Sequence, residues 1–291
     1  MSARTVLGRG VFNAWQRGIA GHINIQHYAQ AIDEARRAFL IGQGHDPHAM
    51  RAAGRGIGAR FHRIDFRAEL SPGDAVRLEA GPVDGGDGTT LLAGEMIRVR
   101  DGAVVDRFEC SLDQIDGPTA SFAGPMRFDA APAERLRPMM RPWVPDAAHP
   151  AMQRTWLGPV EVRESDELGL LGPRGLFDMT TRGIWAAQIR LGLTLETFRK
   201  EGFAGGVSAL MLRQVRLARL AELLEVRTCV TGIGQRSIRF GHWIGNADWG
   251  ETVATVDYAM AFADRATGAP RAPSDRILDA ARAAMITGDA A

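Results

Sequence analysis

The feature that most constrains this chain is a pattern that occurs twice along it. Each half of the 291 residues reads as a short strand, a glycine-containing loop, one amphipathic helix and four alternating strand-like segments. Positions that match between the halves lie 148 residues apart, as in the pairs Gly21 and Gly169, Gly44 and Gly192, and Asp74 and Glu222. A gapless shared order of this kind is rarely accidental, so the sequence predicts a tandem repeat of one structural unit.

The two predicted helices carry the strongest periodic signal. In the first, residues 25–41, Ile32, Ala35 and Phe39 recur at three- and four-residue spacing, which places them on one helix face. The second helix is predicted over residues 176–191. Gly42 and Gly44 end the first helix, and Gly192 ends the second, because glycine adopts left-handed conformations without steric cost.

Strand signals surround each helix. Short strands are predicted before the helices, at residues 11–15 and 158–162. The alternating segments that follow are residues 60–70, 75–80, 89–100 and 104–113 in the first half and residues 209–217, 223–230, 237–244 and 252–263 in the second. Turn sequences such as Asp101-Gly102 between these segments favour hairpins. The pattern predicts an α+β fold in which each helix lies across a curved antiparallel sheet.

The proline-rich segment 124–150 divides the chain. We predict a first unit at residues 1–123, a linker at 124–150, a second unit at 151–275 and a C-terminal helix or tail at 276–291. A half-sheet leaves unpaired edge strands, and the linked copy is the nearest partner for them. We therefore expect the two sheets to meet edge to edge.

Composition excludes several classes of protein. Lys and Arg total 35 against 34 Asp and Glu, a balance that gives no support to a nucleic-acid or membrane-surface protein. Two cysteines, Cys110 and Cys229, are too few for a disulfide framework or a zinc cluster, and we expect both to be buried thiols. No stretch approaches the ~18 apolar residues of a membrane span, and no secretory signal begins the chain, so we expect a cytoplasmic protein.

A short motif before the first helix resembles a known signature. The residues are Gly21-His22-Ile23-Asn24, Tyr28 and Asp33-Glu34-Ala35-Arg36, followed later by Leu70-Ser71-Pro72-Gly73-Asp74. They resemble the hotdog-fold thioesterases of the 4-hydroxybenzoyl-CoA thioesterase type. The resemblance implies a double hotdog fold and hydrolysis of an acyl-CoA or acyl-carrier-protein thioester, with no metal or organic cofactor.

The resemblance also implies catalytic candidates. The family places an acid three residues before the motif glycine, where the first half has Gly18 and the second half has Asp166. We favour Asp166 as the catalytic carboxylate, with Glu34 on the first helix as the substitute if the first half works. His22 would polarise the thioester or orient water, and Asn24 would also cap the first helix. Backbone donors for the substrate are expected from the glycines of the two loops, Gly21, Gly169, Gly172 and Gly175.

Two other functions stay open. Degenerate loops in both halves would leave a non-catalytic acyl-thioester binding protein, and a hotdog hydratase or dehydratase would need Asp166 and His22 in one site. The scattered basic residues do not decide between coenzyme A and a carrier protein. The resemblance leaves room for association of whole chains into a homo-oligomer.

Overall fold

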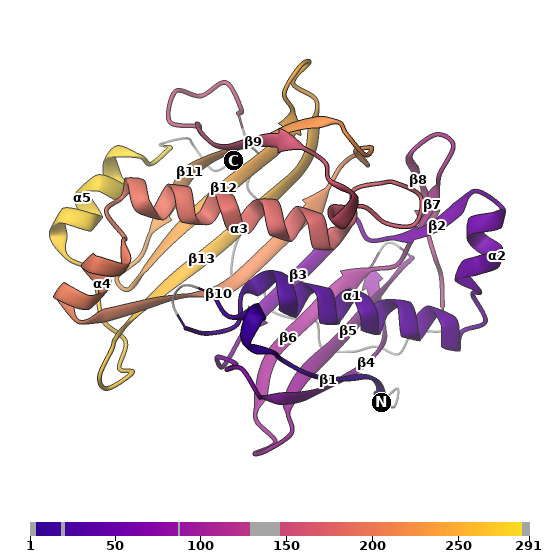
Figure 1. Cartoon of the computed structure of the whole chain (residues 1–291), viewed down its shortest axis with the longest axis horizontal. Helices are drawn as coiled ribbons and strands as arrows, with labels where there is room; N and C mark the ends of the chain where they lie inside the picture. The colour runs from indigo at the N-terminus through magenta and orange to yellow at the C-terminus, as the bar shows by residue number, and fades with distance from the viewer. Residues whose placement is uncertain (1–3, 19–20, 87, 129–145, 287–291) are drawn as a thin grey trace.

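The computed structural model of the chain describes residues 4–18, 21–86, 88–128 and 146–286. These residues form a ten-stranded antiparallel sheet, a separate three-stranded sheet and two long helices that lie side by side on one face of the large sheet (Figure 1). The arrangement confirms the α+β class and the double hotdog, in which each long helix is wrapped by one half of the sheet.

The first half contains eight strands and two α-helices among its described residues. They are β1 (Thr5–Val11), α1 (Ile25–Gly42), α2 (Pro47–Ala52), β2 (Arg55–Gly58), β3 (Phe61–Phe66), β4 (Ala75–Gly86), β5 (Thr89–Arg98), β6 (Val104–Ser111), β7 (Asp113–Asp116) and β8 (Ser121–Pro125). The second half contains β9 (Gln153–Pro159), α3 (Pro173–Arg190), α4 (Leu195–Glu201), β10 (Phe203–Gln214), β11 (Leu223–Ile233), β12 (Ser237–Asn246), β13 (Thr252–Asp264) and α5 (Asp275–Ala283).

Corresponding elements keep the spacing seen in the sequence. Strands β1 and β9 begin at Thr5 and Gln153, and helices α1 and α3 begin at Ile25 and Pro173, so both pairs are 148 residues apart. The pairing of β1 with β4 matches that of β9 with β11 residue for residue, including one irregularity in each pair. The two halves can therefore be compared position by position.

The two half-sheets are continuous with each other. Strand β3 of the first half pairs antiparallel with β10 of the second, with Arg63 opposite Met211 in the middle of the five paired positions. The strand order is β1-β4-β5-β6-β3-β10-β13-β12-β11-β9. This confirms the predicted edge-to-edge pairing.

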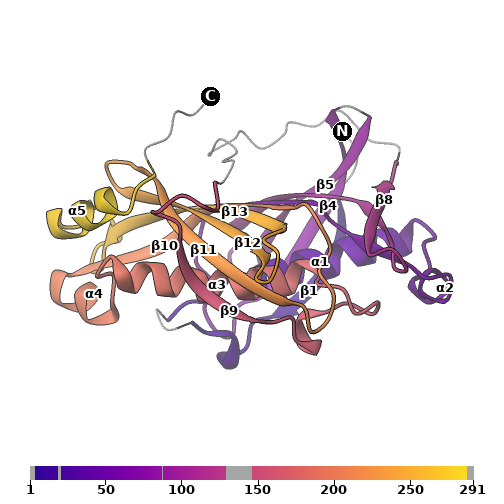
Figure 2. The ribbon, with the colours of Figure 1, turned by 90° about the horizontal axis from the view of Figure 1, so that it is seen from above.

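The predicted helix faces are also confirmed. Ile32, Ala35 and Phe39 are 0%, 1% and 6% exposed and belong to the main hydrophobic core. Seen from above, both long helices lie on the same side of the large sheet (Figure 2). Gly44 and Gly192, just beyond the helix ends, have φ of +85° and +77°, the conformation that glycine adopts most easily.

The opening strands were predicted too late in each half. β1 ends at Val11 and β9 at Pro159, and short 3₁₀ turns follow at Ala14–Gln16 and Val162–Glu164. The side chain of Gln16 accepts a hydrogen bond from the Asn13 N–H at 2.7 Å, and this local bond winds the chain out of the strand.

The halves differ most in the strand after their short helices. β10 is continuous over twelve residues, whereas the corresponding stretch of the first half is split into β2 and β3. β2 leaves the large sheet and pairs with β7 in the small one. The beginning of β10 was not predicted. It extends the sheet beside α3, where it forms one wall of the cavity described below.

Several expectations concern the ends and the linker. Of the predicted linker at 124–150, residues 129–145 lie outside the described residues, as do 287–291 of the C-terminal segment. Cys110 and Cys229 are buried free thiols, and burial raises the pKa of each to about 12. Within the described residues, every helix is too short or too polar to cross a membrane.

Candidate functional site

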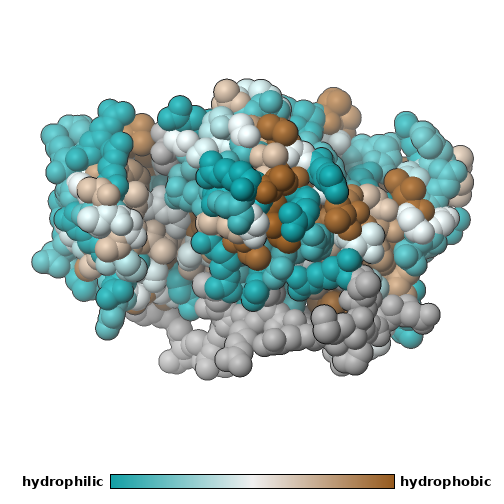
Figure 3. All heavy atoms as spheres, turned by 90° about the horizontal axis from the view of Figure 1, so that it is seen from below, coloured by the Kyte–Doolittle hydropathy of each residue, from teal (hydrophilic) through white to brown (hydrophobic). Residues whose placement is uncertain are grey.

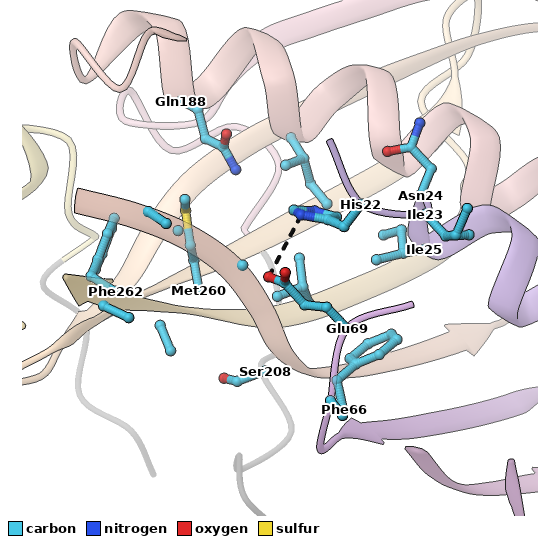
Figure 4. Close-up of a pocket in the computed structure, with 18 of the residues that line it drawn as sticks. His22, Ile23, Asn24, Ile25, Phe66, Glu69, Gln188, Ser208, Met260 and Phe262 are labelled. Carbon is cyan, nitrogen blue, oxygen red and sulfur yellow. Dashed lines mark ion pairs between the residues drawn. The ribbon is translucent and has the colours of Figure 1, made fainter. Parts of the chain in front are cut away.

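A cavity of about 380 Å³ lies between the two halves. The first half contributes the loop before α1, including His22 and Asn24, and the loop after β3, including Glu69. The second half contributes α3, β10 and β13, and Figure 4 shows the two sets of residues around one space. Much of the wall is apolar, from Phe66, Ile184, Trp185, Phe198, Val207, Met260 and Phe262.

A tight turn presents His22 to this cavity. The Gly18 N–H donates to the His22 carbonyl at 2.8 Å, and the Gly21 N–H donates to the Gly18 carbonyl at 3.0 Å. Gly21 has φ of +100°, a value that side-chain-bearing residues rarely adopt. Gly21 therefore shapes the turn that positions His22.

Tyr28 links the motif loop to the loop after β3. Its hydroxyl oxygen accepts a hydrogen bond from the Leu70 N–H at 3.0 Å, and the Leu70 carbonyl accepts one from the Ile23 N–H at 3.0 Å. Burial raises the pKa of Tyr28 well above its usual range, so the phenol stays neutral. These bonds hold Glu69, which precedes Leu70, opposite the histidine of the motif.

His22 and Glu69 face each other inside the cavity. Nδ1 of His22 lies 3.6 Å from Oε1 of Glu69 (Figure 4). The His22 side chain is 27% exposed and that of Glu69 is 70% exposed, so water reaches both. Glu69 is the acidic residue among the cavity's lining residues, and the sequence reasoning missed it. The one sequence feature that could have indicated Glu69 is its position directly before Leu70-Ser71-Pro72-Gly73-Asp74, the segment that resembles the family.

Asn24 occupies the N-cap position of α1 but does not cap it with its side chain, contrary to the prediction. A Cβ at Gly18 would lie only 2.5 Å from the Asn24 amide oxygen. The amide thus occupies the space that an acidic side chain at position 18 would need. In the first turn of α1 the His27 N–H already donates to the Asn24 carbonyl at 3.0 Å, whereas the N–H groups of Ile25 and Gln26 precede the first hydrogen bond of the helix, and Ile25 lines the cavity.

Asp166 lies outside this cavity. Its Oδ1 accepts hydrogen bonds from the backbone N–H groups of Leu168 at 2.8 Å and Leu170 at 3.0 Å. Burial raises the pKa of this carboxyl above its ordinary value. Gly169, with φ of +72°, completes the loop that the carboxylate closes. The structure thus gives Asp166 a loop-closing role and does not bring it together with His22.

The N-terminal turn of α3 is covered by the chain segment around Glu164. Gly172 is its N-cap, and the Gly172 N–H donates to the Glu164 carbonyl at 3.3 Å. A Cβ at Gly175 would lie 2.6 Å from the same carbonyl oxygen. The backbone groups expected to bind substrate here are therefore packed against the chain itself.

The space in the second half that corresponds to the cavity is filled. Leu170 stands where the first half has His22, and it packs with Ile115 and Leu217. A Cβ at Gly56 would lie 2.6 Å from the Leu168 side chain, which shows how closely this region is packed. Leucine packing replaces the polar groups that a site would need.

Charge pairs close the adjoining face of α1. Arg36, which is fully buried, and Arg37 both pair with Asp33, and Arg37 also reaches Glu167 at 3.1 Å. Burial alone would raise the pKa of Asp33, but the two arginines outweigh it and lower the pKa to about 2. The pair between Arg37 and Glu167 also ties α1 of the first half to the loop before α3 of the second.

Glu34 lies on another face of α1. It is exposed, its Oε1 accepts a hydrogen bond from the Gln30 amide at 2.9 Å, and it faces a separate hollow beside β1. Of the four predicted catalytic residues, the structure therefore brings His22 and Asn24 to the cavity and places Glu34 and Asp166 elsewhere.

Comparison with known proteins agrees with this geometry. Residues 15–144 match the model of the thioesterase-like superfamily. A Lactobacillus plantarum structure provisionally named an oleoyl thioesterase superposes with a TM-score of 0.68 at 11% identity, covering 93% of this chain and 98% of that one. An acyl-ACP thioesterase from Bacteroides thetaiotaomicron gives 0.63 at 10% identity, covering 87% and 96%. The 12:0-ACP thioesterase from Umbellularia californica gives 0.61 at 10%, covering 87% and 92%. A search of curated protein sequences finds no match.

These findings confirm the resemblance noted in the sequence. The matched region contains the motif around His22 and Tyr28 and spans less than half of the chain, and the similar structures show that the chain has the hotdog fold. Among the residues that the structure describes, no group of three or more His, Cys, Asp or Glu side chains is arranged to hold a metal ion.

Proposed function

We propose that the chain hydrolyses acyl thioesters in the cavity between its two halves. The observation that carries the proposal is the pairing of His22 with Glu69 beside the uncapped start of α1, within an apolar cavity. These are the groups that thioester hydrolysis requires: a base, donors for the oxyanion and an apolar wall for the acyl chain.

The geometry supports a histidine base held by a carboxylate. Glu69 faces Nδ1 of His22, which favours the tautomer with its proton on Nδ1 and leaves Nε2 free to accept one. In the free protein such catalytic contacts are often long and tighten when substrate binds, which accommodates the 3.6 Å separation. His22 is then the general base and Glu69 orients and stabilises it.

The proposed reaction has two steps, addition of water and loss of the thiol. Nε2 of His22 takes a proton from water while the water oxygen bonds to the thioester carbonyl carbon. The N–H groups of the first turn of α1, at the positive end of the helix dipole, stabilise the oxyanion. The carbon–sulfur bond then breaks, the histidine returns its proton to the thiolate, and a carboxylic acid and a free thiol leave.

The two halves would have different tasks in this reaction. The reacting groups come from the first half, and the apolar side chains that would hold the acyl chain, such as Phe198, Met260 and Phe262, come from the second. We propose an acyl-CoA or acyl-carrier-protein as the substrate, since the structurally similar proteins include acyl-ACP thioesterases by name.

The test is release of free thiol from acyl-CoA and acyl-carrier-protein substrates of increasing chain length, followed with a thiol reagent. We expect catalytic turnover with at least one chain length. Binding of an acyl thioester without thiol release from any substrate would instead support the non-catalytic binding protein.

A further inference from the structure

A second hollow, of about 270 Å³, lies between the edge strand β1 and helix α1. It is separate from the proposed active site, since the two share no lining residue. Apolar groups such as Leu78 and Ala31 line it, and its polar lining residues are Arg9, Gln16, His27, Gln30 and Glu34. Seen from below, the side of the molecule toward which β1 lies is largely hydrophilic, with hydrophobic residues toward the middle (Figure 3).

The second half of the chain shows what fills the corresponding place there. Gly8 of β1 lies opposite Leu78, and Trp156 of β9 lies opposite Val226, at matching positions of the two strand pairs. The indole of Trp156 covers its own strand so closely that a Cβ at Gly158 would lie 2.6 Å from it. Where the second half has an indole ring, the first half has only the hydrogen of Gly8.

The charge beside the ring is also reversed between the halves. The guanidinium of Arg182 lies 5.5 Å from the centroid of the Trp156 ring. The matching position on α1 is Glu34, an exposed carboxylate on the rim of the hollow. The second half therefore holds an indole ring beside a cation. The first half has space for a ring, and the carboxylate of Glu34 lies beside that space.

His27 adds a buried polar group to this wall. It is 7% exposed, and its Nδ1 is buried with no hydrogen-bond partner among the described residues. Burial lowers its pKa, so the ring is neutral near pH 7. An unpartnered buried nitrogen lowers stability unless a ligand or water satisfies it.

We propose that the hollow between β1 and α1 binds an aromatic amine: a planar ring of indole size with a cationic side chain. The ring takes the place that Trp156 fills in the second half, and the ammonium group pairs with Glu34. Apolar hollows in proteins accept aromatic molecules of matching size. The proposal does not depend on thioester hydrolysis, since its residues lie outside the active-site cavity.

Isothermal titration calorimetry with three probes tests the chemical class. Tryptamine carries the ring and the cation, indole the ring alone, and indole-3-propionate the ring with an anion. We expect tryptamine to bind with one site per chain, indole to bind more weakly, and indole-3-propionate to bind most weakly. Failure of tryptamine to bind, or tighter binding of the anion, would overturn the proposal.

Variants locate the binding at the hollow. Gly8→Trp copies the second half, and its Cβ would meet Leu78 at an ordinary 3.7 Å, so we expect a folded chain that no longer binds tryptamine. Gly42→Ala, at the end of α1, is the control, because Gly42 does not line the hollow and a Cβ there meets nothing within 4 Å, and it should bind as the wild type does. Glu34→Gln should weaken tryptamine binding about two- to fivefold, the range for a largely exposed ion pair, and leave indole binding unchanged.

Two results would contradict this location. One is unchanged tryptamine binding by a folded Gly8→Trp chain. The other is equal loss of tryptamine and indole binding in Glu34→Gln, which would show that the carboxylate does not recognise the cation. Should Gly8→Trp fail to fold, Gly8→Leu fills part of the same space and should weaken the binding of both ligands.

Discussion

Replacing His22 by alanine is expected to lower kcat for thioester hydrolysis by at least about 10²-fold, because a general base contributes about 10² to 10⁴ in rate. The side chain lies at the cavity wall and is partly exposed, so its removal should leave the fold intact. Steady-state thiol release, with circular dichroism to check folding, measures the effect.

His48→Ala is the matched control for this experiment. His48 is an exposed histidine on the short helix α2 and does not line the cavity, so its loss should leave kcat unchanged. A His22→Ala chain that keeps kcat within a few-fold of the wild type would remove His22 from the reaction.

Phe39→Ala should lower the free energy of unfolding by about 3–5 kcal/mol, the cost of removing a large buried aromatic side chain and leaving a cavity. Phe39 is 6% exposed, belongs to the main core and contacts Phe128 with ring centroids 5.3 Å apart. Chemical denaturation measures the change in the free energy of unfolding, with the slope against denaturant concentration held equal for the two proteins.

Ile41→Ala on the same helix provides the comparison. Ile41 is 53% exposed, so its truncation removes little buried area and should change the stability by less than about 1 kcal/mol. Equal effects of the two substitutions would contradict the assignment of the buried helix face.

The sequence was sufficient to predict the parts of the fold that depend on local pattern. Helix α1 and the core positions Ile32 and Phe39 were predicted because hydrophobic periodicity reports burial directly, and the edge-to-edge sheet was predicted because unpaired edge strands need a partner. The opening strands were misplaced because side-chain bonds such as that of Gln16 decide where a strand gives way to a turn. Periodicity carries no record of such bonds.

The candidate site was only half predictable. His22 and Asn24 belong to one contiguous motif, so their proximity to each other is fixed by the chain. Glu69 reaches His22 only through the fold, by way of the bonds among Tyr28, Leu70 and Ile23. No spacing rule links a residue in the loop after β3 to one in the loop before α1, so pattern alone could not pair them.

The prediction of Asp166 shows that a matching motif position does not by itself place a residue in the cavity. Its position matches an acid in the family pattern, yet the Leu168 and Leu170 N–H groups hold its carboxylate within the loop. A motif position specifies a place in the chain but not the partners that the surrounding residues provide. In the second half those residues are leucines that fill the space.

The central claim is that one site, containing His22 and Glu69, performs the hydrolysis. Steady-state kcat for Glu69→Gln and Asp166→Asn, measured side by side on the best acyl thioester, tests it most directly. We predict a loss of at least about 10²-fold for Glu69→Gln and a change of no more than about threefold for a folded Asp166→Asn chain. The reverse result, an active Glu69→Gln chain and an inactive but folded Asp166→Asn chain, would contradict the claim.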